Sequence, residues 1–298
     1  VTAATMTTPR IVVAGDVIDD VIAVIDQPLR ANTDTPSRIK RTLGGSAANT
    51  AVWLAHQGCT VDFFASVGTR DVARCSEDFS QAGVTPHLMA DPERETGSLV
   101  SIVHGDDRSM LSDRGANLAL DPSALSDAVL ANASWLHLTG YSFFHHKRPE
   151  SFATLIQRAR SHGLEVMVDA SSAGFLLDLG PTQFLRWVSE ATLLRCNEEE
   201  AHLLAGSTDT EVALARLRKS FPRVIITAGD QGSLVSDGQG TNRITAVVPE
   251  QDVDPTGAGD AFNAGVLAGL ARGLSLEESA TQAAKLAAVA VSQLGGRP

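Results

Sequence analysis

A turn of small residues followed by a carboxylate lies in the segment DPTGAGDAF at 254–262. The turn can present the backbone N–H groups of Gly257, Ala258 and Gly259 to a phosphate, because an apolar helix follows it. Asp260, at the start of that helix, could take a proton from an alcohol. A glycine-rich turn before a helix is also a common packing device, but this combination supplies what phosphoryl transfer to a hydroxyl requires.

A second glycine-containing segment, GGSAANTA at 44–51, opens another expected helix. The paired glycines Gly44 and Gly45 let the backbone approach a ligand closely. Asn49 offers both a donor and an acceptor to a hydroxyl group. The segment is therefore equipped to hold a hydroxyl-bearing molecule.

Two polar segments follow later runs of strand type. The residues NEEE at 197–200 come directly after an apolar stretch and would suit a capped, acidic helix start. The residues TAGDQG at 227–232 form a glycine-bearing turn after a β-branched run. Ligands gather outside the carboxyl ends of the strands in an open α/β sheet, so this turn is well placed for one.

Strand and helix candidates alternate along most of the chain. Strands are expected at 11–14, 60–66, 135–138, 165–169, 192–195, 224–227 and 233–236, and helices at 47–57, 149–162, 210–220, 261–270 and 276–293. This alternation predicts an α/β fold with a doubly wound, mainly parallel sheet and helices on both faces. No linker divides the chain, so we expect one domain over residues 1–298. Short strand-like pieces interrupt the alternation at about 21–42 and 97–112.

Composition excludes several classes of partner. The formal net charge of −11 argues against binding to nucleic acid or to an anionic membrane surface. No apolar run approaches the length of a membrane span. The three cysteines are scattered, which excludes a CxxC metal site and fits a reducing, cytoplasmic location.

Taken together, these segments resemble the motifs of the ribokinase-like carbohydrate kinase family, also called the PfkB family. The likeness extends over nearly the whole chain and is strongest at 254–262. It implies a kinase that uses ATP and Mg²⁺, with Asp260 as the catalytic base and Gly257, Ala258 and Gly259 as the anion hole. It also implies that the pieces at about 21–42 and 97–112 form a small, discontinuous β-sheet lid over the acceptor.

The resemblance assigns residues to the acceptor. Gly44, Gly45 and Asn49 match the sugar-binding motif of the family, and Asp20 matches an Asp that accepts hydrogen bonds from substrate hydroxyls. Asp16, which precedes Asp20, reads more simply as a solvated turn or strand end.

Arg114 lies in the stretch RGAN, which resembles a family segment that approaches the sugar from beside the lid. It could meet an acidic acceptor, or it could pair with Asp113 or Asp121. Ile18 and Ser46 stand where ribokinase itself carries Asn and Lys, which puts ribose in doubt. The acceptor therefore stays open between a pentose, a hexose, a keto-deoxy sugar acid and a nucleoside.

On the nucleotide side, the resemblance places Thr227, Gly229 and Gly232 around the phosphates and ribose of ATP. The alanine-rich helix expected at 276–293 could form a wall of the adenine slot or could simply pack closely. Asn197 also belongs to this side of the site.

The resemblance also implies two metal sites. Asn197 and Glu200 match the N-x-x-E motif that organises Mg²⁺ and its waters. Magnesium commonly keeps several waters, so an amide and a carboxylate outside its first shell are chemically adequate. Asp254 and Thr256 match positions that help to bind an activating K⁺, although Asp254 could instead cap the local turn.

The sequence therefore predicts an ATP-dependent phosphotransferase that phosphorylates a primary hydroxyl of a sugar or sugar derivative. A nucleoside kinase of the pseudouridine or adenosine type is an alternative within the same chemistry. A non-catalytic sugar-sensing protein is a second alternative, which the presence of Asp260 and the complete anion hole disfavours. A homodimer formed through the lid is a further hypothesis.

Overall fold

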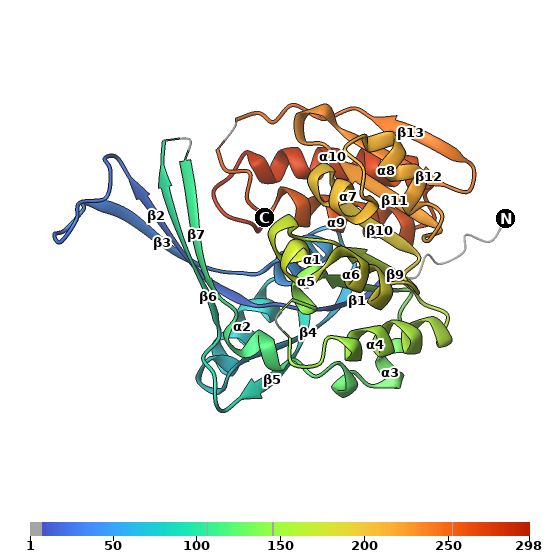
Figure 1. Ribbon diagram of the computed structural model, residues 1–298. Coiled ribbons are helices and arrows are strands. Elements are labelled where there is room, and N and C mark those ends of the chain that lie inside the picture. The colour runs from blue at the N-terminus through green and yellow to red at the C-terminus, as the bar shows by residue number, and fades with distance from the viewer. Residues whose placement is uncertain (1–7, 106, 145, 252) are drawn as a thin grey trace.

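A computed structural model of the protein describes residues 8–105, 107–144, 146–251 and 253–298, so residues 1–7 of the predicted domain lie outside it. Its centre is a nine-stranded sheet in the order β13-β12-β11-β10-β9-β8-β1-β4-β5, with helices on both faces (Figure 1). The strands of this main sheet are β1 (Arg10–Ala14), β4 (Thr60–Gly68), β5 (Val84–Asp91), β8 (Trp135–Thr139), β9 (Glu165–Asp169), β10 (Leu193–Asn197), β11 (Arg223–Thr227), β12 (Ser233–Asp237) and β13 (Gly240–Ile244). From β5 to β11 neighbouring strands pair in parallel, and β12 and β13 pair antiparallel at one edge.

Alternate side chains of the parallel strands enter two different cores. In β1, Ile11 and Val13 pack into one core, whereas Val12 and Ala14 pack into the core on the opposite face. Because both faces are buried, the inner strands are nearly continuous apolar runs. This explains why the sequence reveals them.

Two groups of helices cover the two faces. The first core receives side chains from α1 (Ser46–His56), α2 (Val72–Gln81), α9 (Ala258–Ala271) and α10 (Leu276–Val291). The second receives them from α3 (Asp127–Leu130), α4 (Glu150–Ser161), α5 (Ala173–Leu179), α6 (Pro181–Trp187), α7 (Glu198–Ala205) and α8 (Thr210–Leu217). Short 3₁₀ helices are η1 (Thr69–Asp71), η2 (Gly115–Ala119), η3 (Pro122–Ala124), η4 (Gly140–Ser142) and η5 (Gly229–Gln231).

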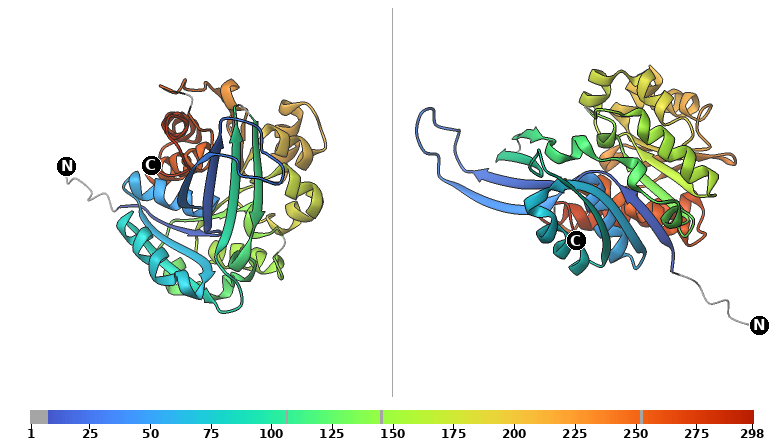
Figure 2. Two further views of the ribbon diagram at one scale, coloured as in Figure 1. Left: turned by 90° about the vertical axis from the view of Figure 1, so that its left-hand side faces the viewer. Right: turned by 90° about the horizontal axis from the view of Figure 1, so that it is seen from below.

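A second, four-stranded sheet projects from one side of the main body (Figure 1, Figure 2). This small sheet has the order β3-β2-β6-β7 and consists of β2 (Ile18–Ile25), β3 (Ser37–Gly44), β6 (Gly97–His104) and β7 (Asp107–Asp113). Two segments far apart in the sequence meet in it through the parallel pair β2 and β6. The predicted fold, with its discontinuous β-sheet, is confirmed.

The structure corrects several predicted boundaries. Helix α9 begins at Ala258, before the predicted 261, because Gly257 adopts a left-handed conformation (φ 81°) that starts the helix there. Strand β2 begins at Ile18, so Asp20 lies inside a strand. The sequence does not predict β5 or β13, since β5 is an edge strand with a Pro and β13 is largely exposed.

In the part of the chain that the structure describes, each helix is too short or too polar to cross a bilayer.

Candidate active site

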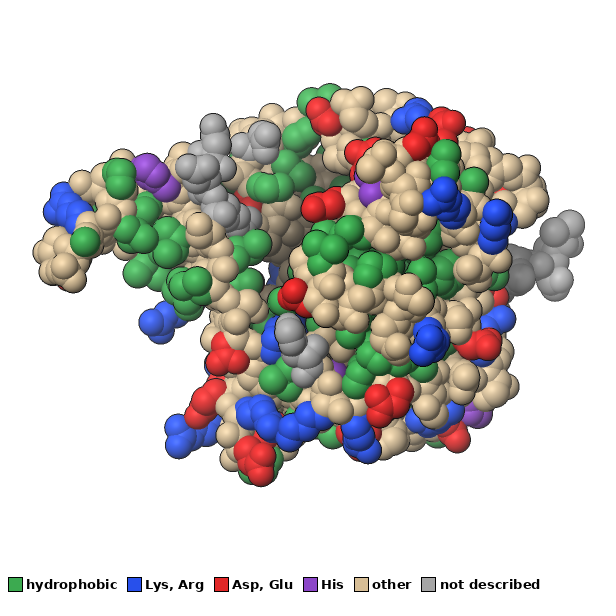
Figure 3. Space-filling view, in the orientation of Figure 1, with side chains coloured by type: hydrophobic (Ala, Val, Ile, Leu, Met, Phe, Trp, Pro, Cys, Tyr) green, Lys and Arg blue, Asp and Glu red, His purple; other side chains and the backbone are tan. Residues whose placement is uncertain are grey.

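Most of the residues predicted for the acceptor and for phosphoryl transfer line one cavity of about 440 Å³. This acceptor cavity lies between the small sheet and the main body, where the space-filling view shows the molecule hollowed (Figure 3). Its lining includes the predicted residues Asp20, Gly45, Asn49, Arg114, Thr256, Gly257, Gly259 and Asp260. The fold thus brings together segments from both ends of the chain.

Gly44 acts on the cavity indirectly. A Cβ atom at this position would lie 2.1 Å from Oδ2 of Asp20. The absence of a side chain therefore lets the Asp20 carboxylate occupy its place beside β3. Asp20 itself projects from β2 into the acceptor cavity.

Asp260 lies in the first turn of α9 and is buried. Its Oδ1 accepts a hydrogen bond of 2.7 Å from Ser46 Oγ, and its Oδ2 accepts one of 2.9 Å from Asn49 Nδ2. Burial raises the pKa of Asp260 to about 7, and the negative charges of Asp169 and Asp16 add to this effect, although the two hydrogen bonds oppose it. A carboxylate with a pKa near neutrality is suited to exchange a proton with an alcohol.

The turn before Asp260 is held against the C-terminal segment of the chain. A Cβ atom on Gly257 would lie 2.4 Å from the Cα of Gly296, so only glycine fits there. Gly296 also accepts a hydrogen bond from Trp53 Nε1 (2.9 Å), which ties the segment to α1. Close contact between these backbones fixes where the N–H groups of the turn point.

Asp254 caps this turn. Its Oδ1 accepts a hydrogen bond of 3.0 Å from the backbone N–H of Thr256, and its Oδ2 accepts one of 3.1 Å from the N–H of Gly295. This is the capping arrangement that the sequence offers as the alternative to a cation site. The K⁺ assignment of Asp254 and Thr256 stays a prediction.

A second cavity, of about 480 Å³, adjoins the first and contains three of the four residues predicted to bind the nucleotide. Thr227, Gly229 and Gly232 line it, and so does Ala258 of the predicted anion hole. Small and apolar side chains complete this nucleotide cavity, among them Ile244, Phe262, Ala284, Ala287, Ala288 and Val291. Both α9 and α10 therefore contribute apolar side chains to the wall of this cavity.

Asn197 and Glu200 form a capping box at the start of α7. Asn197 Oδ1 accepts from the N–H of Glu200 (2.8 Å), and Glu200 Oε2 accepts from the N–H of Asn197 (2.8 Å). Burial, followed by the charge of Asp169, raises the pKa of Glu200 to about 7. Neither Asn197 nor Glu200 is among the described residues that line the acceptor cavity or the nucleotide cavity.

The structure gives Arg114 a partner that the sequence does not predict. Arg114 Nη1 pairs with Asp16 Oδ2 at 3.2 Å, and its guanidinium lies over the ring of Tyr141, 5.0 Å from the ring centroid. The alternative pairing with Asp113 or Asp121 is not found: Arg114 pairs with Asp16, while Asp113 accepts from the N–H of Gly115 and Asp121 caps η3.

Asp16 is not a solvated turn residue. It is 2% exposed and also accepts a hydrogen bond of 3.0 Å from the backbone N–H of Ala47 at the start of α1. Asp16 lies where the chain passes from β1 in the main sheet to β2 in the small sheet, and the sequence around it does not reveal this burial.

A second buried ion pair escapes the sequence analysis. Arg195 in β10 pairs with Asp169 at the end of β9 at 3.1 Å, and both line the acceptor cavity. Asp169 also accepts a hydrogen bond of 2.6 Å from Asn263 Nδ2 of α9. A charged residue inside an otherwise apolar strand is the signal that could have found this pair.

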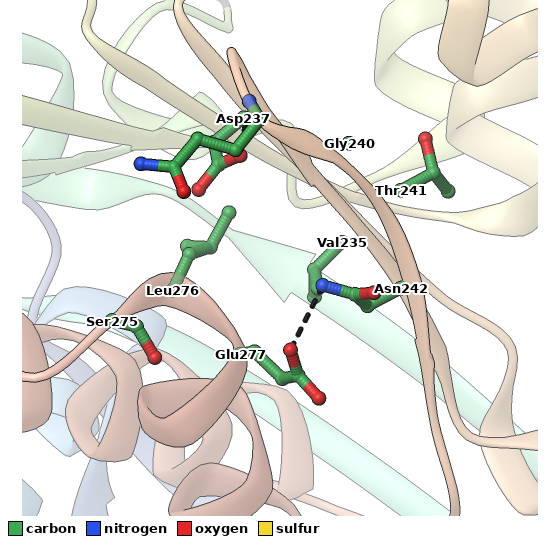
Figure 4. A pocket seen from close by; sticks show the side chains of 9 residues that line it. Val235, Asp237, Gly240, Thr241, Asn242, Ser275, Leu276 and Glu277 are labelled. Atoms are coloured by element: carbon green, nitrogen blue, oxygen red, sulfur yellow. Dashed lines mark hydrogen bonds between the residues drawn. The ribbon is translucent and has the colours of Figure 1, made fainter.

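Another cavity, also of about 440 Å³, lies between the β12–β13 hairpin and the start of α10 (Figure 4). A hydrogen bond of 2.9 Å from Asn242 Nδ2 to Glu277 Oε2 crosses it. The described residues that line it include none of the predicted site residues, so we assign it no part in the chemistry.

Known proteins resemble the chain over most of its length. Adenosine kinase from Saccharomyces cerevisiae is 29% identical over 86% of this chain and 79% of its own, and ribokinase from Haemophilus influenzae is 27% identical over 94% and 90%. The solved structure of adenosine kinase from Sinorhizobium meliloti is similar with a TM-score of 0.87 and 26% identity, covering 98% of this chain and 96% of that one. The family model described as pfkB family carbohydrate kinase matches residues 8–298. The chain therefore belongs to the pfkB family of carbohydrate kinases, which are ATP-dependent phosphotransferases.

Proposed function

We propose that the protein transfers the γ-phosphoryl group of ATP to a primary hydroxyl of a neutral sugar or sugar derivative. The observation that carries this proposal is the position of Asp260, which lies in the acceptor cavity directly after a turn that borders the nucleotide cavity. In-line phosphoryl transfer needs a base beside the acceptor hydroxyl and N–H groups that bind the transferring phosphate, and this arrangement offers both.

In the proposed reaction, Asp260 accepts the proton of the attacking hydroxyl. Ser46 and Asn49 hold the two carboxylate oxygens, so the carboxylate is oriented before the acceptor arrives. The N–H groups of Gly257, Ala258 and Gly259 stabilise the charge on the transferring group, because α9 directs its positive end toward it.

The acceptor hydroxyls are held by Asp20 and Asn49. Gly44 supports this role because its missing side chain leaves room for the Asp20 carboxylate, and Gly45 allows close contact with the backbone of Asp16. Both polar residues line the same cavity as Asp260. Carboxylate and amide oxygens that accept from several hydroxyls would fix which hydroxyl faces the base.

Thr227, Gly229 and Gly232 bind the nucleotide, and the alanines of α10 lie beside its adenine ring. Asn197 and Glu200 lie outside the linings of both cavities and would act on Mg²⁺ through water, since amide and carboxylate oxygens suit this ion. When bound, Mg²⁺ neutralises phosphate charge. Asp254 and Thr256 would hold a monovalent cation beneath the anion-hole turn.

The charges of the cavity support a neutral acceptor. The carboxylates of Asp16 and Asp169 are balanced by Arg114 and Arg195. Asp260, when ionised, adds a further negative charge to the lining. A sugar acid would therefore meet net repulsion. Arg114, engaged by Asp16, then serves to shape the cavity.

A nucleoside acceptor is the second candidate, supported by the walls of the cavity. The small sheet contributes Ile22, Leu99 and Met110, and the main body contributes Tyr141 and Phe175. Apolar and aromatic walls suit a flat base attached to a sugar better than a small free sugar.

A coupled assay of ADP release tests these functions. Purified protein with ATP and Mg²⁺ is assayed against neutral sugars, sugar acids and nucleosides. We expect turnover with a neutral acceptor. Turnover with sugar acids alone would contradict the charge argument, and binding of sugars without turnover would establish the non-catalytic sugar-sensing function instead.

We also propose that the small sheet forms a homodimer contact. The strand register puts Ile39 and Leu111 on the face opposite Asp20, and both are exposed, at 62% and 64%. Sedimentation of the wild type and of Ile39→Glu tests this. A dimer that the substitution dissociates supports the contact, and a wild-type monomer at all concentrations contradicts it.

A further inference from the structure

We propose that Arg195 is a catalytic residue that contacts the phosphoryl group while it passes from ATP to the acceptor. The inference rests on the proposed function and extends it to a residue outside the recognised motifs of the sequence. Its guanidinium would donate hydrogen bonds to the equatorial oxygens of the transferring group, with Asp169 and Thr227 fixing its orientation.

Arg195 lies where the two cavities meet. The lining of the nucleotide cavity and the lining of the acceptor cavity share two residues, Arg195 and Gly259. A phosphoryl group that moves from one cavity to the other passes between a base, Asp260, and these two residues. Arg195 brings a permanent positive charge to that junction.

The guanidinium is held from two sides. Its Nη1 donates to both oxygens of Asp169 (3.1 and 3.2 Å), and its Nη2 donates to Thr227 Oγ1 (2.9 Å). Asn263 of α9 donates a hydrogen bond to Asp169 and so fixes the carboxylate that pairs with Arg195. Arg195 is 8% exposed, and its Nε has no hydrogen-bond partner among the described residues. A fixed guanidinium loses little entropy when it binds an oxyanion.

The surroundings of Arg195 favour an anion. A Cβ atom on Gly259 would lie 3.3 Å from its Nη2, so the guanidinium packs against the first turn of α9. The positive end of a helix disfavours a cation beside it. Asp169 compensates part of this cost, and a phosphoryl group between the turn and Arg195 would interact favourably with both.

The proposed step is balanced. The acceptor oxygen forms a bond to the γ-phosphorus, and the bond from that phosphorus to the β,γ-bridging oxygen breaks. ADP leaves with the electron pair, and the hydroxyl proton goes to Asp260. Arg195 keeps its protons throughout and acts by stabilising the charge on the equatorial oxygens.

Arg195→Gln and Arg195→Lys test this role. Arg223→Lys is the matched control, because Arg223 lies in the next strand, also pairs with a carboxylate, that of Glu165, and lies outside both cavities. The two readouts are kcat with an acceptor from the panel, and the affinity for Mg²⁺–ADP with and without aluminium fluoride, which mimics the transferring group.

We expect aluminium fluoride to tighten binding of ADP to the wild type by about 10²-fold or more. Arg195→Gln should lose this gain and at least about 10² in kcat, while its affinity for ADP alone stays within a few-fold of the wild type. Arg195→Lys should recover only part of both. Arg223→Lys should keep both.

Several outcomes would overturn the proposal. One is an Arg195→Gln variant that keeps a near-wild-type kcat and in which aluminium fluoride still tightens the binding of ADP as in the wild type (the fluoride effect). Another is an equal loss of affinity for ADP with and without fluoride, which indicates a structural role. Absence of a fluoride effect in the wild type would also contradict it. If the wild type phosphorylates no acceptor yet shows the fluoride effect, the proposed function fails and the role of Arg195 at the phosphate stands.

Discussion

Asn49 donates a hydrogen bond of 2.9 Å to the carboxylate of Asp260, across 211 residues of sequence. This bond joins the glycine-rich segment of α1 to the first turn of α9. The segment predicted to bind the acceptor, at 44–51, and the segment predicted to bind the phosphate, at 254–262, therefore meet at the carboxylate of Asp260. Loss of Asn49 would be expected to disturb both the acceptor and the base.

Asp20→Ala should weaken binding of the acceptor much more than binding of ATP. Asp20 lines the acceptor cavity, and its removal leaves acceptor hydroxyls unpaired at a cost of about 1.5–3 kcal/mol per charged hydrogen bond. Calorimetric titration of each ligand separately measures this. Equal losses for both ligands would assign Asp20 a structural role.

Gly44→Ala should reduce affinity for the acceptor without unfolding the protein. The new methyl group would displace the Asp20 carboxylate, which is a mobile side-chain end and can move at low cost. Thermal unfolding and the KM of the acceptor are compared with those of Gly174→Ala in α5, whose Cβ would meet no atom closer than 4.0 Å. An unchanged KM in Gly44→Ala would show that Asp20 does not need its present position.

Ser46→Ala should move the pH profile toward higher pH. The pKa of Asp260 is about 7, and the Ser46 hydrogen bond lowers it by stabilising the ionised form. Because the base must be ionised, kcat/KM should rise as pH increases through the pKa and then level. Removal of the hydrogen bond raises the pKa, so the rise should occur at higher pH. An unmoved or acid-shifted profile would contradict the assignment.

Activity should increase when K⁺ replaces Na⁺ or a bulky organic cation at constant ionic strength, mainly in kcat. A cation held by Asp254 and Thr256 would fix the turn so that the N–H groups of Gly257 and Gly259 converge on the developing charge. Equal rates in all three cations would show that Asp254 only caps the turn, as its bond to the N–H of Thr256 allows.

The sequence predicts the fold well where strands are buried on both faces, because β1 or β11 then appears as an uninterrupted apolar run. It predicts Asp260 because a carboxylate after a glycine turn has a clear chemical meaning. It does not predict β5 or β13, whose exposed positions carry no regular pattern.

The two buried ion pairs show the limit of this approach. The partners of Arg114 and Arg195 lie 98 and 26 residues away, at the ends of other strands. Such partners follow from strand order, which local periodicity does not give. An isolated arginine in the sequence therefore offers several acidic partners and no way to choose among them.

The transfer of labelled γ-phosphate from ATP to an acceptor of the panel, compared between the wild type and Asp260→Asn, tests the central claim most directly. Asp260 acts on the reacting proton, so its loss should abolish labelled product while affinity for the acceptor stays within a few-fold of the wild type. General bases contribute about 10²–10⁴-fold to rates. A variant that keeps more than about a tenth of the wild-type kcat would contradict the assignment of Asp260 as the base.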